Sequence, residues 1–286
     1  KNSNVHVLQY FGLYNKYYLL DYQMSIKTEI SKWVNLKSFP LDSIDFVDKC
    51  RQKLSNTGVL LLPQFLLPEA LKQTIKEAKA RAHLAYFTKN THNVYLSQPD
   101  TSLPDTHVFN RQVKSSKGCI TTDQIQSESG LHVIYNNSMF KKFIAHVVQE
   151  SAIYPYADPL SGINIHYASE GEELGWHFDN SSFAITLLLQ APKEGGVFQY
   201  VNDLHNTNSE EMNFDGIEAV LNEKTTVKTL HMEEGTLILF RGLNSLHRVT
   251  PTIGSRTRIL VVLAYNNKAG VSLSENARMT FFGRLS

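Results

Sequence analysis

Gly175-Trp176-His177-Phe178-Asp179-Asn180 places a histidine and an aspartate two positions apart, among aromatic residues. Side chains at alternate positions of a β-strand point to the same face, so His177 and Asp179 would converge while Phe178 turns away. A second segment, Ser245-Leu246-His247-Arg248-Val249-Thr250-Pro251, brings another histidine. Two histidines and one carboxylate form the set that binds non-haem Fe(II) and leaves coordination positions open. The sequence therefore predicts a metal site made of His177, Asp179 and His247.

The composition predicts a single globular domain without a partner recognised by bulk charge. The 286 residues are 42% hydrophobic, which is enough to bury one core. Lysine plus arginine number 28 and aspartate plus glutamate 27, so the net charge is +1. That balance argues against a nucleic acid or an anionic membrane as partner, and it leaves open a small acidic ligand held by one or two arginines. No apolar run approaches the roughly 20 residues that span a bilayer.

The cysteines and the N-terminus bear on the compartment and on where the domain begins. Cys50 and Cys119 are far apart and predict free thiols rather than a disulfide or a zinc site. Free thiols are typical of a reducing compartment, so we expect an intracellular, cytoplasmic location. Residues 1–23 lack the pattern of a secretory signal. We interpret them as an extension upstream of a biological start at Met24, which leaves 24–286 as one domain.

Helical spacing dominates the N-terminal part, residues 24–155. Apolar residues recur at helical intervals in four stretches, with Ser138 as the N-cap of the last. These stretches are 26–34, 44–54, 68–82 and 138–148. A short buried strand is expected at residues 59–62. We interpret the polar stretch 88–130 as a long loop that covers one end of the fold.

From about residue 160 the pattern changes to short strands separated by turn residues. The expected strands lie at 162–167, 183–189, 197–201, 227–231, 236–240, 247–249 and 258–265, with a polar insertion at about 203–224. Several short strands at this spacing are typical of a double-sheet jelly roll. The predicted fold class is therefore mainly β, with α+β character. Its core would be a double-stranded β-helix over 156–286, with N-terminal helices packed on one sheet.

Several segments, in this order, resemble the Fe(II)/2-oxoglutarate-dependent oxygenases. They are Trp176-His177-Phe178-Asp179, Gly195-Gly196-Val197-Phe198, Gly235-Thr236-Leu237-Ile238-Leu239-Phe240, Ser245–Pro251, Arg258-Ile259 and the closing Asn276–Arg284. The resemblance covers about residues 55–286 and is strongest from 160 onward. Within the superfamily, the chain looks most like the branch that tailors free amino acids and small metabolites. That branch contains hydroxylases and radical halogenases of lysine, and the kainoid-forming dioxygenases are a further comparison.

The resemblance implies roles for the metal ligands and for the cosubstrate site. His177, Asp179 and His247 match the iron ligands; the alternative, an ordinary half-buried histidine at 177, loses weight once the other segments follow in order. The 2-oxoglutarate anion needs a cation that matches a carboxylate, which arginine supplies. Arg258 fits the family pattern best, and Arg256, two residues earlier, is the reserve. Tyr167 resembles a tyrosine that bonds the cosubstrate, with a core tyrosine as an equal alternative.

Substrate contacts are expected from the surroundings of this motif. Arg111 in the covering loop matches an arginine that faces the site in this branch, and a solvated loop arginine is its alternative. Asn180 follows the aspartate directly and Trp176 precedes the histidine, so both are assigned to the substrate side. Arg278 and Arg284 would bind a substrate carboxylate or anchor the C-terminus.

Asp179 separates the expected reactions. In the family's halogenases a small residue replaces this carboxylate so that chloride binds the iron. The resemblance therefore implies a dioxygenase that uses Fe(II), 2-oxoglutarate and O₂ and releases succinate and CO₂. It would hydroxylate or oxidatively cyclise a small amino-acid-like metabolite, for example by ring closure of an N-prenylated glutamate in kainoid biosynthesis. The alternatives are a peptidyl or protein hydroxylase of the same superfamily and a jelly-roll metal-binding sensor without catalysis.

Overall fold

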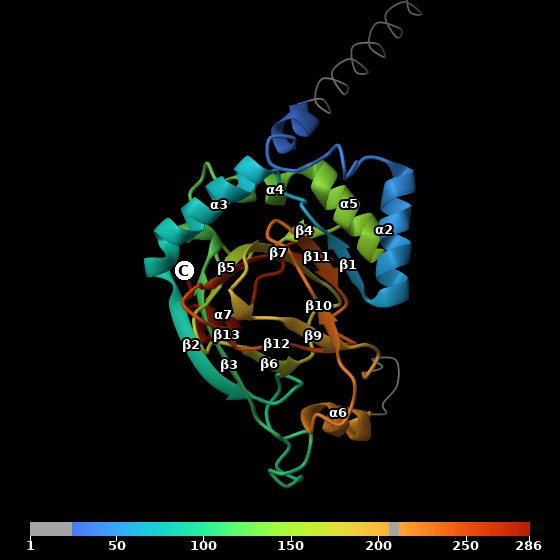
Figure 1. Cartoon of the computed structure of the whole chain (residues 1–286), viewed down its shortest axis with the longest axis vertical. Helices are drawn as coiled ribbons and strands as arrows, with labels where there is room; N and C mark the ends of the chain where they lie inside the picture. Colours follow the sequence, from blue (N-terminus) through green and yellow to red (C-terminus); the bar gives the residue numbers. More distant parts are fainter. Residues whose placement is uncertain (1–24, 206–211) are drawn as a thin grey trace, which may run out of the picture.

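In the computed structural model, which describes residues 25–205 and 212–286, eleven antiparallel strands form one curled sheet (Figure 1). The strand order is β1-β11-β7-β14-β5-β3-β6-β12-β9-β10, with β2 paired to β3 on the side. We call the six strands β1, β11, β7, β14, β5 and β3 the major half of the sheet. The strands β6, β12, β9 and β10 form the minor half. The inner faces of the two halves face each other, which is the arrangement of a jelly roll and confirms the predicted fold class.

The strands have the following bounds. They are β1 Val59–Leu62, β2 Tyr86–His92, β3 Val113–Ile120, β5 Ile163–Ala168, β6 Leu174–His177, β7 Ala184–Gln190, β9 Phe198–Val201, β10 Lys228–Leu230, β11 Leu237–Phe240, β12 Leu246–Val249 and β14 Arg258–Leu263. Two short pairs join β13 (Thr252–Ile253) to β8 (Glu194–Gly195) and β15 (Tyr265–Asn266) to β4 (Tyr154–Pro155).

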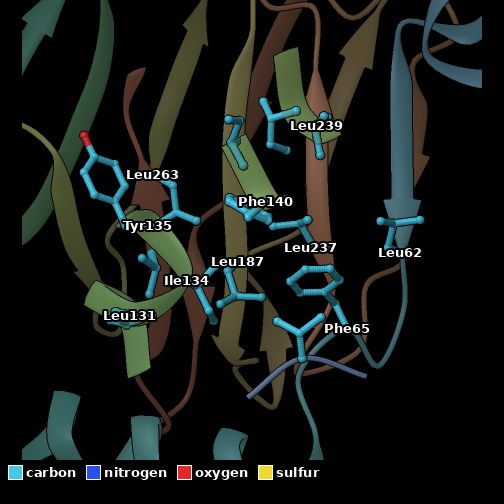
Figure 2. Close-up of a cluster of buried hydrophobic side chains, with 14 of the residues drawn as sticks. Leu62, Phe65, Leu131, Ile134, Tyr135, Phe140, Leu187, Leu237, Leu239 and Leu263 are labelled. Atoms are coloured by element: carbon cyan, nitrogen blue, oxygen red, sulfur yellow. The ribbon is translucent and has the colours of Figure 1, made fainter. Parts of the chain in front are cut away.

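Helices cover the outer face of the major half (Figure 1). They are α2 Ile44–Thr57, α3 Pro68–Arg81, α4 Gly130–Asn136 and α5 Ser138–Val148, while α6 Phe214–Leu221 and α7 Glu275–Phe282 lie elsewhere. Figure 2 shows the core between this face and the helices, where Leu187, Leu237 and Leu239 from the sheet meet Phe65 and Phe140. Burying each such side chain contributes about 1.5–3 kcal/mol, so this layer fixes which face of the sheet points outward.

Local sequence explains where the predicted helices begin and end. In α2 the buried residues Val47, Cys50 and Leu54 recur at helical spacing, and Gly58 ends the helix in the left-handed conformation that glycine allows. Two details differ from the prediction. Helix α5 is capped by the side chain of Asn137 rather than by Ser138, because Asn137 accepts the backbone N–H groups of the first turn. The helix expected over 26–34 ends at residue 30.

The expected loop 88–130 is the main correction to the predicted secondary structure. It holds most of β2, all of β3, the 3-10 turn Thr122–Gln124 and the start of α4, so only residues 93–112 form a long loop. Strand β2 is largely exposed on both faces, since it pairs only with β3 at the side of the sheet. A strand exposed on both faces has no buried stripe, so its sequence carries no alternation of apolar and polar residues.

The predicted helical part, 24–155, and the predicted jelly-roll core, 156–286, are not two separate layers of the structure. Strands β1, β2 and β3 precede residue 155 yet belong to the main sheet. The polar insertion at 203–224 contains α6. The expected extension 1–23 and the start at Met24 lie outside the described residues. Cys50 and Cys119 are buried and free, as expected. Within 25–205 and 212–286, every helix is too short or too polar to cross a bilayer.

Candidate metal centre

The three predicted ligands lie together at the junction of β6 and β12. These strands are antiparallel neighbours in which His177 pairs directly with His247, so both imidazoles point to the inner face. Strand β6 ends at His177, and Asp179 is held instead by its backbone N–H, which donates to the carbonyl of Gly242 (3.1 Å). Oδ1 of Asp179 lies 3.6 Å from Nε2 of His177 and 3.5 Å from Nε2 of His247. The turn at 241–245 thus holds the Asp179 carboxylate next to the two imidazoles, because Asp179 lies beyond the end of the strand that orients His177.

Backbone carbonyls fix the tautomer of both histidines. Nδ1 of His177 lies 2.8 Å from the carbonyl oxygen of Gly175, and Nδ1 of His247 lies 2.9 Å from that of Ser245. A carbonyl oxygen only accepts, so each Nδ1 carries a hydrogen. In the neutral imidazole, Nε2 then keeps its lone pair, and this is the state in which histidine binds a metal.

The electrostatics of the group keep its carboxylate charged. Burial acts to raise the pKa of Asp179, but the charges and hydrogen bonds of His247 and His177 outweigh it and hold this pKa well below its usual range. Burial, followed by the charge of His247, lowers the pKa of His177, which favours the neutral imidazole. Around neutral pH, Asp179 is therefore an anion that faces the Nε2 atoms of both histidines.

These residues fit a single divalent ion. Oδ2 of Asp179 is buried and has no hydrogen-bond partner among the described residues, although a buried charged oxygen left unpaired is costly. Two donors that each lie about 2.1 Å from one ion can be at most about 4.2 Å apart. The Nε2–Oδ1 separations of 3.6 and 3.5 Å satisfy that bound. One ion can therefore be held by Nε2 of both histidines and Oδ1 of Asp179.

Arg258 faces the interior, whereas Arg256 does not. Arg258 is the first residue of β14, is only 6% exposed, and packs its stem against Gly196 of the turn before β9. Burial lowers the pKa of Arg258 to about 10, so the guanidinium stays protonated at neutral pH. Arg256 precedes the strand and forms an ion pair with Glu234 (2.7 Å) and a hydrogen bond to the carbonyl of Ala191 (2.8 Å). Alternation along a strand does not extend to Arg256, because the strand begins after it.

Tyr167 lies on the opposite face of β5 from the interior. It packs in the core under the helices, and its hydroxyl donates to the carbonyl of Ala78 in α3 (2.7 Å). The structure therefore supports the core tyrosine that the sequence left as an alternative, and it corrects the expected cosubstrate contact.

The expected substrate contacts also lie away from the ligand cluster. Arg111 binds the backbone of Leu221 (3.0 Å) and the side chain of Asn222 (2.5 Å), which fastens the loop 93–112 to the end of α6. Trp176 packs on the outer face of the minor half, with the guanidinium of Arg248 4.8 Å from its ring centre. Asn180 is exposed. None of these three side chains joins the cluster of His177, Asp179 and His247 in the described structure.

The two C-terminal arginines anchor the end of the chain. Arg284 forms an ion pair with Asp123 (2.7 Å), and Arg278 donates to the carbonyl of Leu285 (2.6 Å). Of the two alternatives in the sequence, the structure supports anchoring.

Sequence reasoning missed three features next to the cluster. Gly242 packs directly against the Asp179 carboxylate. Ser115 accepts the backbone N–H of Gly175 (3.0 Å) and contacts Nε2 of His92 (2.7 Å), which braces the strand that carries His177. Lys117 lies on the inner face beside His166. Ser115 and Lys117 belong to the stretch 88–130, for which the sequence predicts a loop, and a predicted loop gives no alternation of faces.

The family model for halogenase D matches residues 43–280, well over half of the chain. The chain belongs to the halogenase D family. This membership, with the fold, confirms the expected class: an oxidoreductase of the Fe(II)/2-oxoglutarate oxygenase superfamily. No curated protein matches the sequence significantly.

Solved structures similar to this halogenase D family member share its fold at low sequence identity. The epimerase SnoN from nogalamycin biosynthesis has a TM-score of 0.53 at 10% identity, over 78% of this chain and 83% of SnoN. The carbocyclase SnoK from the same biosynthesis has a TM-score of 0.53 at 8% identity, over 76% of this chain and 82% of SnoK. HygX from Streptomyces hygroscopicus, solved with nickel, 2-oxoglutarate and hygromycin B, has a TM-score of 0.52 at 13% identity, over 79% and 89% of the two chains.

Proposed function

We propose that this halogenase D family member is an Fe(II)- and 2-oxoglutarate-dependent dioxygenase whose iron ligands are His177, Asp179 and His247. The observation that carries the proposal is the convergence of two tautomer-fixed Nε2 atoms on an Asp179 carboxylate whose other oxygen is buried and unpaired. When bound, iron and 2-oxoglutarate supply the oxidation of a substrate C–H bond by O₂, with release of succinate and CO₂. The chain would supply the two lone pairs and the negative charge that bind the metal.

Arg258 is proposed to bind the distal carboxylate of 2-oxoglutarate. Its guanidinium is buried on the inner face, and no hydrogen bond or ion pair joins its side chain to another described residue. A buried cation without a partner is costly, and a planar guanidinium matches a carboxylate with two parallel hydrogen bonds. An anionic cosubstrate would satisfy both requirements.

The aromatic residues around His247 would keep water from the reacting centre. The rings of Phe198 and Phe240 lie 5.5 and 4.8 Å from the imidazole, centre to centre, on the inner face of the sheet. An apolar wall strengthens the electrostatic interactions inside the site and favours a substrate that presents an unactivated C–H bond. The same interior also receives the cationic side chains of Arg258 and Lys117, so it offers both apolar and charged contacts.

The retained carboxylate supports hydroxylation or oxidative cyclisation rather than halogenation. Asp179 fills the ligand position that a halogenase of this family keeps free for chloride. We propose an amino-acid-derived small molecule as substrate, on the resemblance to the branch that tailors free amino acids. Ring closure of an N-prenylated glutamate is one reaction of this class.

The decisive experiment measures succinate formed from 2-oxoglutarate with Fe(II) under oxygen, for wild type and for His177→Ala. Because many such enzymes turn over slowly without substrate, a panel of free amino acids and their N-alkyl derivatives is added. We expect wild-type turnover to exceed that of the variant and to rise with one substrate class. Wild-type turnover equal to that of His177→Ala across the panel would overturn the proposal.

A further inference from the structure

Two long cationic side chains point into the interior without an acidic partner. Arg258 begins β14 and Lys117 belongs to β3, and neither forms an ion pair with any residue in 25–205 or 212–286. Among the described residues, the side chain of Lys117 forms hydrogen bonds only to the ring of His166, with Nζ 3.3 Å from Nδ1 and 3.5 Å from Nε2. Because a buried charge requires compensation, the buried Arg258 with the half-buried Lys117 beside it points to an anionic ligand rather than to a purely structural role.

The strand register places the two cations on one face in one row. Arg258 pairs with Ala168 of β5. The pairing of Gly118 with Tyr167, continued by one residue, puts Lys117 beside Ala168 on its other side. Directly paired residues point to the same face, so the two side chains flank the small methyl group of Ala168. Strands two positions apart are separated by about 9.6 Å, a span that two long side chains can close onto one ligand group.

His166 supports Lys117 without neutralising it. Burial, followed by the charges of Lys117 and Arg258, holds the pKa of His166 well below its usual range. A neutral imidazole carries one acceptor nitrogen, so it can take one hydrogen from the lysine ammonium and leave the others free. His166 therefore orients Lys117 while the positive charge stays available.

Lys117 lies nearer to the candidate metal ligands than Arg258 does. Burial lowers the pKa of Lys117, and the negative charge of Asp179 acts in the opposite direction. The pKa of Arg258 is lowered by burial alone, with no contribution from Asp179. The strand order agrees, because β3 lies directly beside β6, which carries His177, whereas β5 and β3 separate β14 from β6.

We infer that Lys117 is a second cosubstrate-binding cation, which shares the distal carboxylate of 2-oxoglutarate with Arg258 and so restricts this enzyme to 2-oxo acids with a second carboxylate. The inference rests on the proposed function. It assigns Lys117 a direct contact with the cosubstrate and His166 a positioning role. Two cations would discriminate more strongly than one against an oxo acid with an uncharged end, since such a ligand leaves both of them unpaired.

The test is anaerobic calorimetry of 2-oxoglutarate binding to the full chain loaded with Mn(II). We expect Lys117→Met to weaken binding about 10- to 100-fold, as the loss of one charge-assisted hydrogen bond implies. The same variant should bind Mn(II) as wild type does. The affinity ratio between 2-oxoglutarate and 2-oxopentanoate, which lacks the second carboxylate, should fall in parallel. Lys89→Met, which alters an exposed lysine of the neighbouring strand β2, is the matched control and should bind as wild type does.

The outcomes distinguish this inference from the proposed function. If Mn(II)-loaded wild type does not bind 2-oxoglutarate, the proposed function fails. If wild type and Lys117→Met bind it equally while Arg258→Gln does not, only the role of Lys117 is overturned. Should Lys117→Met fail to fold, the wild-type protein still decides. Dipolar recoupling between [5-¹³C]oxoglutarate and ζ-¹⁵N-labelled lysine should then report one lysine in contact with the carboxylate, and no recoupling would overturn the inference.

Discussion

The backbone of Gly242 lies so close to Asp179 that a Cβ atom at position 242 would overlap the carboxylate oxygen Oδ2. The carbonyl of the same glycine accepts the backbone N–H of Asp179 at 3.1 Å. The conformation of Gly242 is not left-handed, so space and not backbone geometry requires glycine there. In this halogenase D family member, the position of the proposed ligand Asp179 thus depends on a glycine that is not itself a proposed ligand.

Gly242→Ala should weaken metal binding by displacing the Asp179 carboxylate. We expect at least a tenfold increase in the Mn(II) dissociation constant, measured by calorimetry, with a fold that stays intact by circular dichroism. Asp179→Gly removes the group that the new methyl would strike. In that background the added alanine should have little further effect on the metal affinity.

The two substitutions therefore form a double-mutant cycle with a defined sign. Coupling of more than about 1 kcal/mol would attribute the effect of Gly242→Ala to its contact with Asp179. Equal losses of metal affinity in both backgrounds would show that the alanine acts on the fold instead.

Asp179→Gly should change the reaction as well as the affinity. We expect hydroxylation or cyclisation of the substrate to be lost, because the metal loses its one anionic ligand from the chain. Addition of chloride should partly restore metal-dependent decarboxylation of 2-oxoglutarate, measured as succinate. Unchanged oxidation of the substrate in this variant would remove Asp179 from the ligand set.

Arg258→Gln and Arg256→Gln should separate the two arginines that the sequence left open. Loss of the buried guanidinium at 258 is expected to weaken 2-oxoglutarate binding by about 100-fold or more, since charge-assisted bonds contribute about 1.5–3 kcal/mol each. Arg256→Gln should leave this affinity almost unchanged, because Arg256 forms an exposed ion pair with Glu234. Anaerobic titration of the Mn(II)-loaded variants measures both, and reversed effects would exchange the assignments.

Tyr167→Phe should affect stability and leave cosubstrate binding unchanged. The lost hydrogen bond from its buried hydroxyl to Ala78 should reduce the free energy of unfolding by about 1 kcal/mol. Urea unfolding measures this change, and the affinity for 2-oxoglutarate is the comparison. A tenfold loss of that affinity would contradict the position of Tyr167 on the helix-covered face.

Asp158 should contribute to the loss of fold stability at acid pH. Its carboxylate is 8% exposed and accepts hydrogen bonds from Leu160, Ser161 and Leu273, which ties the segment before α7 to the start of β5. Burial opposes the effect, but these hydrogen bonds lower the pKa of Asp158 below its usual value. A carboxyl with a lowered folded-state pKa stabilises the protein above its unfolded pKa of about 3.9, and this contribution is lost as pH falls through the folded value.

Asp158→Asn should therefore destabilise the protein by about 1–3 kcal/mol at pH 6, and the difference from wild type should shrink towards pH 3. Denaturant unfolding of both proteins across this range is the measurement. A difference that stays constant with pH would assign the loss to packing and not to the charge.

The sequence alone predicted the candidate ligand set, the candidate cosubstrate cation Arg258 and most elements of the jelly roll. Helices α2 and α3 each bury one stripe, so their period is visible in the chain. His177 and Asp179 lie within one short segment, and His247 lies in a second segment whose own pattern is visible in the chain. These features are local, and local patterns survive without knowledge of the packing.

Only the tertiary structure decided which face of each strand points to the candidate metal site. In β5 the polar residues Asn164 and His166 share one face, and the structure buries that face almost as fully as the apolar one, because helices cover one side and the interior lies on the other. Alternation then shows that His166 and Tyr167 point in opposite directions without showing which points inward. The helices packed on the major half make that choice, and with it they turn Lys117 and Arg258 towards the site. The contact of Gly242 with Asp179 likewise joins residues 63 positions apart, which no local pattern reveals.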